Sequence, residues 1–386
     1  MKGSMKRKKR LMTNEKPVVL VTGASGLIGK GVVDDLAPEY RMVGFDVKEP
    51  DSDLAKRVDW IHCDLTDDAS TAQAFEELRA GHGDRIASVI HLAAYYDFSA
   101  EPSPLYQELT VEGTIRMLRQ LNRFELEQFV FSSSLLAMKP VEPGETLTEQ
   151  SPTQAEWDYP RSKLEAEEAI ERERGTIAAV VLRIAGVYDE DCHSLPISQQ
   201  IRRIYEKELE SHFFPGNQEH GQSFVHREDL IRCFRRVVER RKKLDGLQTI
   251  LVGEPEVVSY GDLQGRFGEL IHGKEWTTLR VPKTVAKVGA WVKDKLTEEK
   301  AFIQPWMVDL ADAHYPVSID KAESELGWTP RHRLADELAV MVSRLREDPR
   351  RWYEENGLPW PGENEEQRSE REEVERSSAT RSRYES

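Results

Sequence analysis

Short apolar runs alternate with amphipathic, helix-like stretches through the first half of the chain. The runs that predict buried strands cover residues 18–21, 42–45, 57–62, 86–91, 128–132 and 177–184. Strands of this kind, separated by helical segments, form a parallel sheet with helices on both faces. We therefore expect an α/β fold built on a doubly wound parallel sheet.

The pattern loosens after residue 188 into helices, short strands and loops rich in Pro, Gly and aromatic residues. We expect a first domain, which contains this sheet, over 17–188. A smaller substrate domain over 189–360, with some elements that return to the sheet, would lie over the strand ends. The basic segment 1–16 lacks the apolar core of a secretion signal, and 361–386 is rich in Glu, Arg and Ser. Both ends are predicted to be disordered, as a leader and a charged tail.

A glycine-rich turn follows the first apolar run. Glycines at positions 23, 26 and 29 permit a tight turn, close approach of the backbone to a pyrophosphate, and close packing of the next helix on the strand. Free amides at the start of that helix face the anion. The turn predicts that 17–188 is a dinucleotide-binding domain of the Rossmann type. The predicted site residues of the turn are Gly23, Ser25, Gly26, Leu27, Ile28 and Gly29.

A carboxylate ends the second apolar run. Asp46 lies about 20 residues after the glycine turn, where an acidic residue accepts hydrogen bonds from the adenosine ribose and repels a 2′-phosphate. This position predicts NAD as the cofactor. Lys48, two residues later, could turn towards such a phosphate, so NADP stays open.

A Tyr-x-x-x-Lys pair begins a clearly helical segment. Tyr159 and Lys163 are four residues apart and share a helix face, and Pro160 fits only in the first turn. The ammonium is predicted to lower the pKa of the phenol towards the range of a general base. The alternative is a surface helix with an ordinary tyrosine. Ser134, 25 residues earlier, ends a strand at the sheet edge where ligands bind, although it could also cap the next segment.

The order and spacing of Ser134, Tyr159 and Lys163 resemble the extended short-chain dehydrogenase/reductases, also called the NAD-dependent epimerase/dehydratase family. Similar family segments are Asp64-Leu65, His91-Leu92-Ala93-Ala94, and residues 182–188, 224–230 and 326–330. The similarity covers roughly residues 17 to 345. It implies that Asp64, Leu65, Ala93 and Ala94 contact the cofactor.

The same resemblance implies a mechanism. Tyr159 would exchange a proton with a substrate hydroxyl or carbonyl, and Ser134 would hydrogen-bond the same oxygen. Lys163 would lower the pKa of Tyr159 and hold the nicotinamide ribose. Thr110 stands where the family usually has Asn, which puts a proton relay through that amide in doubt.

Several positions depart from the family members that bind a sugar nucleotide. Gly186, Gln222 and Asp309 stand where those members supply an amide and two guanidiniums to the diphosphate. Arginines that could compensate are Arg202, Arg203, Arg227 and Arg280. An apolar lining is expected instead from Leu135, Leu136 and Met138. We therefore expect a small or apolar substrate.

These features predict an NAD(P)-dependent oxidoreductase that acts on a hydroxyl or ketone by hydride transfer. A sugar-nucleotide epimerase or dehydratase, which would retain its cofactor tightly, is the first alternative. A non-catalytic dinucleotide sensor is the second, and the intact Ser, Tyr and Lys set argues against it.

Composition narrows the partners. The net charge of −15 argues against nucleic acid. No apolar run is long enough to cross a bilayer, so a cytoplasmic protein with a small-molecule substrate is expected, with a homodimer as one option. The three cysteines are far apart and lack metal-ligand spacing, which predicts free thiols and no metal site.

Overall fold

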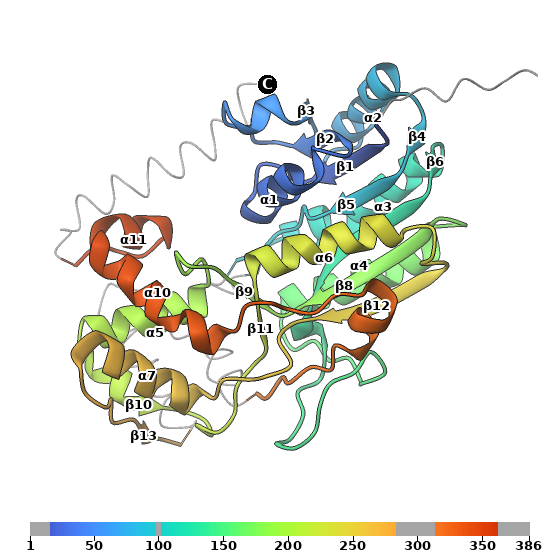
Figure 1. The fold of residues 1–386 in the computed structure, drawn as a ribbon. Coiled ribbons are helices and arrows are strands. Elements are labelled where there is room, and N and C mark those ends of the chain that lie inside the picture. The colour runs from blue at the N-terminus through green and yellow to red at the C-terminus, as the bar shows by residue number, and fades with distance from the viewer. Residues whose placement is uncertain (1–15, 98–101, 283–312, 362–386) are drawn as a thin grey trace, which may run out of the picture.

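The computed structural model describes residues 16–97, 102–282 and 313–361, and seven parallel strands form its central sheet (Figure 1). The strands are β1 (Val18–Thr22), β2 (Arg41–Asp46), β3 (Asp59–His62), β5 (Ser88–His91), β7 (Gln128–Ser134), β8 (Ala178–Ile184) and β12 (Leu247–Val252). Their order in the sheet is β12-β8-β7-β5-β1-β2-β3. The chain winds outward from β1 in both directions, which confirms the doubly wound sheet.

Helices cover both faces of the sheet. They are α1 (Leu27–Leu36), α2 (Asp68–His82), α3 (Glu112–Leu121), α4 (Asp158–Glu173) and α6 (Arg227–Arg240). In β1, Val19 and Val21 pack into one core with α1 and α6, while Val18 and Leu20 pack into another with α2, α3 and α4. Side chains alternate between the faces of a strand, so a strand covered on both faces must be apolar throughout.

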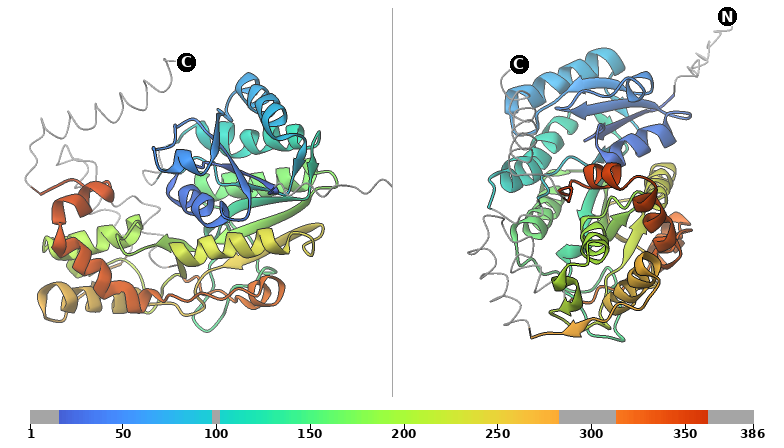
Figure 2. Two further views of the ribbon diagram at one scale, coloured as in Figure 1. Left: turned by 45° about the horizontal axis from the view of Figure 1, so that its top comes forward. Right: turned by 90° about the vertical axis from the view of Figure 1, so that its left-hand side faces the viewer.

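The second half of the chain contributes a smaller unit and also completes the sheet (Figure 2). The smaller unit has its own buried core, formed largely by α5 (Leu195–Tyr205), α7 (Tyr260–His272), α10 (Leu334–Glu347) and α11 (Pro349–Glu355). Between these elements the chain returns to the sheet as α6 and β12. The sequence did not predict β12, because its apolar run follows the region where alternation had faded.

The remaining elements are short. The strands are β4 (Arg85–Ile86), β6 (Glu125–Leu126), β9 (Gly186–Tyr188), β10 (Phe213–Phe214), β11 (Phe224–His226) and β13 (Leu279–Arg280), which pair as β4–β6, β9–β11 and β10–β13. The 3₁₀ turns are η1 (Leu54–Lys56), η3 (Leu135–Ala137) and η4 (Leu209–His212), and the π turns are η2 (Tyr106–Val111) and η5 (Ala322–Leu326). Across the described ranges, no helix is both long and apolar enough to span a bilayer.

The strand order reverses between β1 and β5. From β1 the chain adds β2 and β3 on one side, and it then crosses to β5 on the other side of β1. In open parallel sheets, ligands bind at this reversal, beyond the carboxyl ends of the strands. The glycine turn after β1, the segment after β5 and the serines at the end of β7 all lie at this edge.

Candidate active site

The glycine turn between β1 and α1 has no room for side chains at two of its glycines. Gly23 has a φ of +67°, a left-handed conformation that strains other residues. A Cβ on Gly29 would lie 2.2 Å from the Gly23 carbonyl oxygen, which shows how closely α1 approaches the turn. The helix therefore begins next to the end of β1, with its first amides at the sheet edge.

Asp46, at the end of β2, is tied to this turn. One carboxylate oxygen accepts a hydrogen bond from the Ser25 backbone N–H at 2.9 Å, and the other accepts from the Lys48 N–H at 3.0 Å. The Ser25 hydroxyl donates to the Lys48 carbonyl at 2.8 Å. The carboxylate is partly exposed beside the glycine turn, where the sequence placed it. Its contact with a ribose stays a prediction.

The other predicted cofactor residues lie along the same edge. Asp64 follows β3 and accepts hydrogen bonds from the Thr66 N–H and hydroxyl at 2.8 and 2.7 Å. Leu65 is buried, and its Cβ would lie 3.2 Å from a Cβ on Gly113. Ala93 and Ala94 follow β5 and are partly exposed.

The three predicted catalytic residues come together at the ends of β7 and α4. Ser134 is the last residue of β7, and Tyr159 and Lys163 lie one turn apart at the start of α4. Ser134 hydrogen-bonds the Tyr159 side chain. The Lys163 ammonium lies 5.8 Å from the centre of the Tyr159 ring and donates to the Ser132 carbonyl at 2.9 Å. Ser134 also caps η3, since its Oγ accepts from the Leu136 N–H at 3.2 Å.

The expected fall in the pKa of Tyr159 is wrong for the protein alone. Desolvation raises this pKa to about 12, and the hydrogen bond with Ser134 only partly opposes the rise. Lys163 is buried as well, and burial lowers its pKa to about 7 although the Glu167 carboxylate favours the charged form. Loss of hydration disfavours both the phenolate and the ammonium, so it opposes the lowering of the Tyr159 pKa that the spacing predicted.

The pKa of Lys163 predicts how stability depends on pH. Between pH 7 and its ordinary pKa of 10.5, the unfolded chain binds a proton that the folded protein releases, so the free energy of unfolding rises with pH. Between pH 7 and 9, cofactor-free wild type should gain about 2 kcal/mol relative to Lys163→Met. Urea unfolding of both proteins at the two pH values measures this. If the two proteins differ by the same free energy of unfolding at pH 7 and pH 9, Lys163 does not titrate in this range.

A buried ion pair supports α4, the helix of Tyr159 and Lys163, and the sequence analysis missed it. Glu167 lies one turn after Lys163. Its carboxylate forms an ion pair with the Arg183 guanidinium of β8 at 2.7 Å and accepts a hydrogen bond from the Ser133 hydroxyl at 2.5 Å. Both charged side chains are about nine-tenths buried. These contacts join α4 to β7 and β8, next to Ser134 in the strand and one turn after Lys163 in the helix. The i, i+4 spacing of Lys163 and Glu167 was the available signal.

A second buried polar chain fixes the segment after β5. The His91 ring bridges the Thr22 hydroxyl at 2.7 Å and the Thr114 hydroxyl at 3.0 Å. The Thr22 hydroxyl also accepts the N–H groups of Leu92 and Ala93 at 3.1 Å. Burial lowers the pKa of His91 to about 3, so the imidazole is neutral. This chain holds the end of β5 against the glycine turn.

Aromatic rings lie beside Tyr159. The Tyr96 ring meets the Tyr159 ring edge to face, with 4.7 Å between centres, and Tyr95 meets Tyr106 in the same manner at 4.8 Å. Tyr96 is half exposed. Thr110, at the position of the usual family Asn, accepts the Tyr95 N–H on its hydroxyl at 3.0 Å.

The predicted apolar lining is wrong at two of three positions. Leu135 and Met138 are buried, because they pack in a core cluster with Tyr315 and Val317 from the last third of the chain. Only Leu136 is partly exposed. The Tyr96 ring, which lies against Tyr159, does supply exposed apolar surface there.

The structure describes two of the three positions that depart from the sugar-nucleotide enzymes. A Cβ on Gly186 would lie 2.7 Å from the Phe224 ring, so Asn at this position would have to displace that ring. Gln222 is partly exposed and bridges to Tyr315, and Asp309 lies outside the described residues.

The arginines that could compensate are mostly engaged or exposed. Arg202 is paired with Glu208 at 3.0 Å and Arg227 with Asp189 at 3.1 Å. The Arg203 guanidinium donates to the Gln199 carbonyl at 3.2 Å, and Arg280 is exposed on β13. Two of the four cations therefore already have a carboxylate partner.

Comparison with known proteins agrees with this architecture. Residues 19–253 match the model of the NAD dependent epimerase/dehydratase family. Human 3 beta-hydroxysteroid dehydrogenase type 7 is 27% identical over 355 residues, which cover 82% of this chain and 92% of that protein. A putative uncharacterized oxidoreductase of Saccharomyces cerevisiae is 30% identical and UDP-glucose 4-epimerase uge1 of Schizosaccharomyces pombe is 29% identical. Those two alignments cover 33% and 40% of this chain, and only 39% and 46% of the relatives.

Solved structures of low sequence identity share the fold. Epimerase Mth375 from Methanothermobacter thermautotrophicus superposes with a TM-score of 0.66 at 18% identity, covering 88% of this chain and 95% of that one. MoeE5 in complex with UDP-glucuronic acid and NAD superposes with a TM-score of 0.64 at 20% identity, covering 85% and 99%. With the family match over most of the sheet, the expected fold, enzyme class and NAD dependence are confirmed, and the chain belongs to the NAD-dependent epimerase/dehydratase family.

Proposed function

We propose that this enzyme oxidises a secondary alcohol, or reduces the matching ketone, of a small or apolar substrate, with Tyr159 as the acid/base residue. Ser134 would hydrogen-bond the reacting oxygen, and Lys163 would hold the nicotinamide ribose. NAD supplies the hydride acceptor when bound. The observation that carries the proposal is the junction of Ser134, Tyr159 and Lys163 at the carboxyl edge of β7 and α4.

The surroundings of Tyr159 support the apolar substrate class. The Tyr96 ring lies against Tyr159, and an aromatic surface favours carbon-rich molecules over diphosphates. Arg202 and Arg227 are neutralised by carboxylates, which leaves less positive charge for an anionic ligand. The hydroxysteroid dehydrogenase is also the reported relative that aligns over nearly its whole length, so hydroxysteroids are the first compounds to test.

A sugar-nucleotide epimerase or dehydratase is the second candidate. Several structural neighbours were solved with such substrates, among them MoeE5 and UDP-glucose 4-epimerase of Thermotoga maritima. Net oxidation and epimerisation differ in whether reduced cofactor accumulates. A panel of 3β-hydroxysteroids, small secondary alcohols and UDP-sugars, incubated with the protein and NAD, tests both. NADH formation from an alcohol supports the proposal, whereas a sugar epimer without NADH supports the second candidate.

Asp46 predicts a preference for NAD. Its carboxylate is fixed by Ser25 and Lys48 and would repel a 2′-phosphate, a loss we expect to exceed tenfold in affinity. Titration of the protein with NAD and NADP measures this. Asp46→Asn should bring the affinities for NAD and NADP closer together, because it removes the repelling charge and keeps the shape of the side chain. Tighter binding of NADP to wild type would contradict the assignment.

A further inference from the structure

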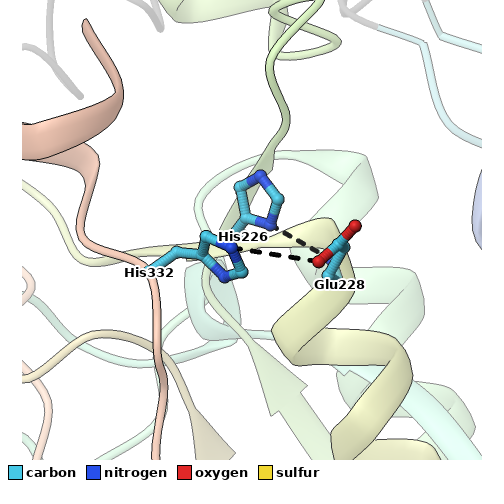
Figure 3. A group of neighbouring side chains, drawn as sticks. All are labelled: His226, Glu228 and His332. Atoms are coloured by element: carbon cyan, nitrogen blue, oxygen red, sulfur yellow. Dashed lines mark hydrogen bonds and ion pairs between the residues drawn. The ribbon is translucent and has the colours of Figure 1, made fainter. Parts of the chain in front are cut away.

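Two histidines and a glutamate that the proposed mechanism does not use lie close together (Figure 3). His226 ends β11 and caps α6, Glu228 lies in the first turn of α6, and His332 lies just before α10. One ligand atom from each residue lies within 4.8 Å of the other two. His332 and Glu228 are 3.9 Å apart between Nε2 and Oε2.

The His332 ring is oriented by a carboxylate. Its Nδ1 lies 3.2 Å from an Asp229 oxygen, which also accepts the N–H groups of Arg331 and His332 at 2.7 and 2.8 Å. Against a carboxylate, Nδ1 carries the proton and donates it. The other ring nitrogen, Nε2, faces Glu228 and is the one that could bind a metal.

The His226 ring also has one nitrogen near a carboxylate and the other near Glu228. Its Nε2 is buried, lacks a hydrogen-bond partner among the described residues, and lies 3.6 Å from a Glu190 carboxylate oxygen. Its Nδ1 accepts the Glu228 N–H at a long 3.3 Å. The proton therefore belongs on Nε2, and the Nδ1 lone pair faces the first turn of α6. Burial lowers the pKa of His226, which favours the neutral ring that a metal requires.

The two rings stack with 4.0 Å between centres and 25° between planes, so each restricts the other. Two imidazole nitrogens and a carboxylate oxygen form a donor set typical of Zn²⁺ and neighbouring transition metals. The N-terminus of α6 would by itself disfavour a cation, but the carboxylates of Glu228 and Asp229 in its first turn offset that charge.

We propose that His226, Glu228 and His332 bind a divalent transition metal such as Zn²⁺, with water completing its coordination. Tetrahedral bonds of about 2.1 Å require ligand atoms about 3.4 Å apart. The set would have to contract slightly, and Glu228, with 65% of its side chain exposed, has room to move inward. The cation would replace the long hydrogen bond at His226.

The location gives such a metal a structural role. His226 and Glu228 belong to the β11–α6 junction, whereas His332 belongs to the segment that leads into α10 of the smaller unit. These positions are more than 100 residues apart in the chain, so no motif spacing predicts the cluster. A cation bound by both would fasten α10 to the part of the chain that returns to the sheet.

Calorimetric titration of tag-free, chelator-treated full-length protein with ZnCl₂ tests the site, and the absorption of added Co²⁺ reports its coordination. We expect one ion per chain. Glu228→Gln, which removes a charge from an exposed side chain, should weaken binding at least tenfold. His332→Phe, which keeps a ring to stack on His226, should abolish stoichiometric binding. His62→Ala, at an exposed histidine of β3, is the matched control and should bind as wild type.

A thermal readout separates this site from surface binding. Zn²⁺ should raise the Tm of wild type and His62→Ala but not of His332→Phe, because only a ligand of the folded state stabilises it. NAD binding verifies that each variant is folded. If His332→Phe does not fold, the comparison of Glu228→Gln with wild type decides whether the metal site exists. The proposal is overturned if wild type binds no stoichiometric ion, or if Glu228→Gln and wild type bind equally well.

Discussion

Tyr159→Phe should lower kcat by about 10²–10⁴-fold, the usual contribution of a positioned acid/base group. The substitution removes the oxygen that hydrogen-bonds Ser134 and keeps the ring that packs against Tyr96. NAD affinity should therefore change little. Steady-state kinetics on the substrate found in the panel, together with NAD titration, measure the two effects separately.

Two further variants sharpen this prediction. Lys163→Ala should reduce both turnover and NAD affinity, because Lys163 is assigned to the cofactor as well as to Tyr159. Tyr96→Phe is the matched control, since it removes a phenol oxygen beside Tyr159 but not the proposed acid/base group. Near-normal turnover of Tyr159→Phe would refute the acid/base assignment.

UDP-sugars should bind weakly or not at all to the NAD-loaded protein. Each charge-assisted hydrogen bond to a diphosphate contributes about 1.5–3 kcal/mol, so the loss of two lowers affinity about a hundredfold or more. Gly186 cannot be replaced by the family Asn without displacing Phe224, and Arg202 and Arg227 are already paired with acids. The expected pattern is therefore weak binding across all nucleotide sugars.

Calorimetry with UDP-glucose, UDP-glucuronate and dTDP-glucose tests this expectation. Arg227→Ala provides a control, because it should leave the weak binding unchanged if Arg227 serves only Asp189. Micromolar binding of any of the three compounds would restore the sugar-nucleotide candidate to first place.

Residues whose positions follow from local periodicity were predicted well. Tyr159 and Lys163 share a face because a helix turns once in 3.6 residues, and the glycines at 23 and 29 are required by a turn of fixed shape. Ser134 was placed because a parallel strand delivers its last residue to the ligand-binding edge. These features depend on neighbours in sequence.

Features that depend on tertiary packing could not be predicted in the same way. Glu167 meets Arg183 only because α4 packs on the sheet, and Leu135 is buried only because Tyr315 and Val317, distant in sequence, pack against the same cluster. The pKa of Tyr159 depends on how much water the fold removes, which the i, i+4 spacing does not report. The sequence therefore predicted which groups would meet more reliably than their protonation.

Transfer of deuterium from substrate to cofactor tests the central claim most directly. The alcohol identified in the panel, deuterated at its carbinol carbon, is incubated with wild type and NAD, and the nicotinamide is analysed by mass spectrometry. Net hydride transfer predicts one deuterium in the accumulated reduced cofactor, formed at least a hundredfold more slowly by Tyr159→Phe. Return of the label to a substrate epimer, or equal rates in the two proteins, would contradict the account.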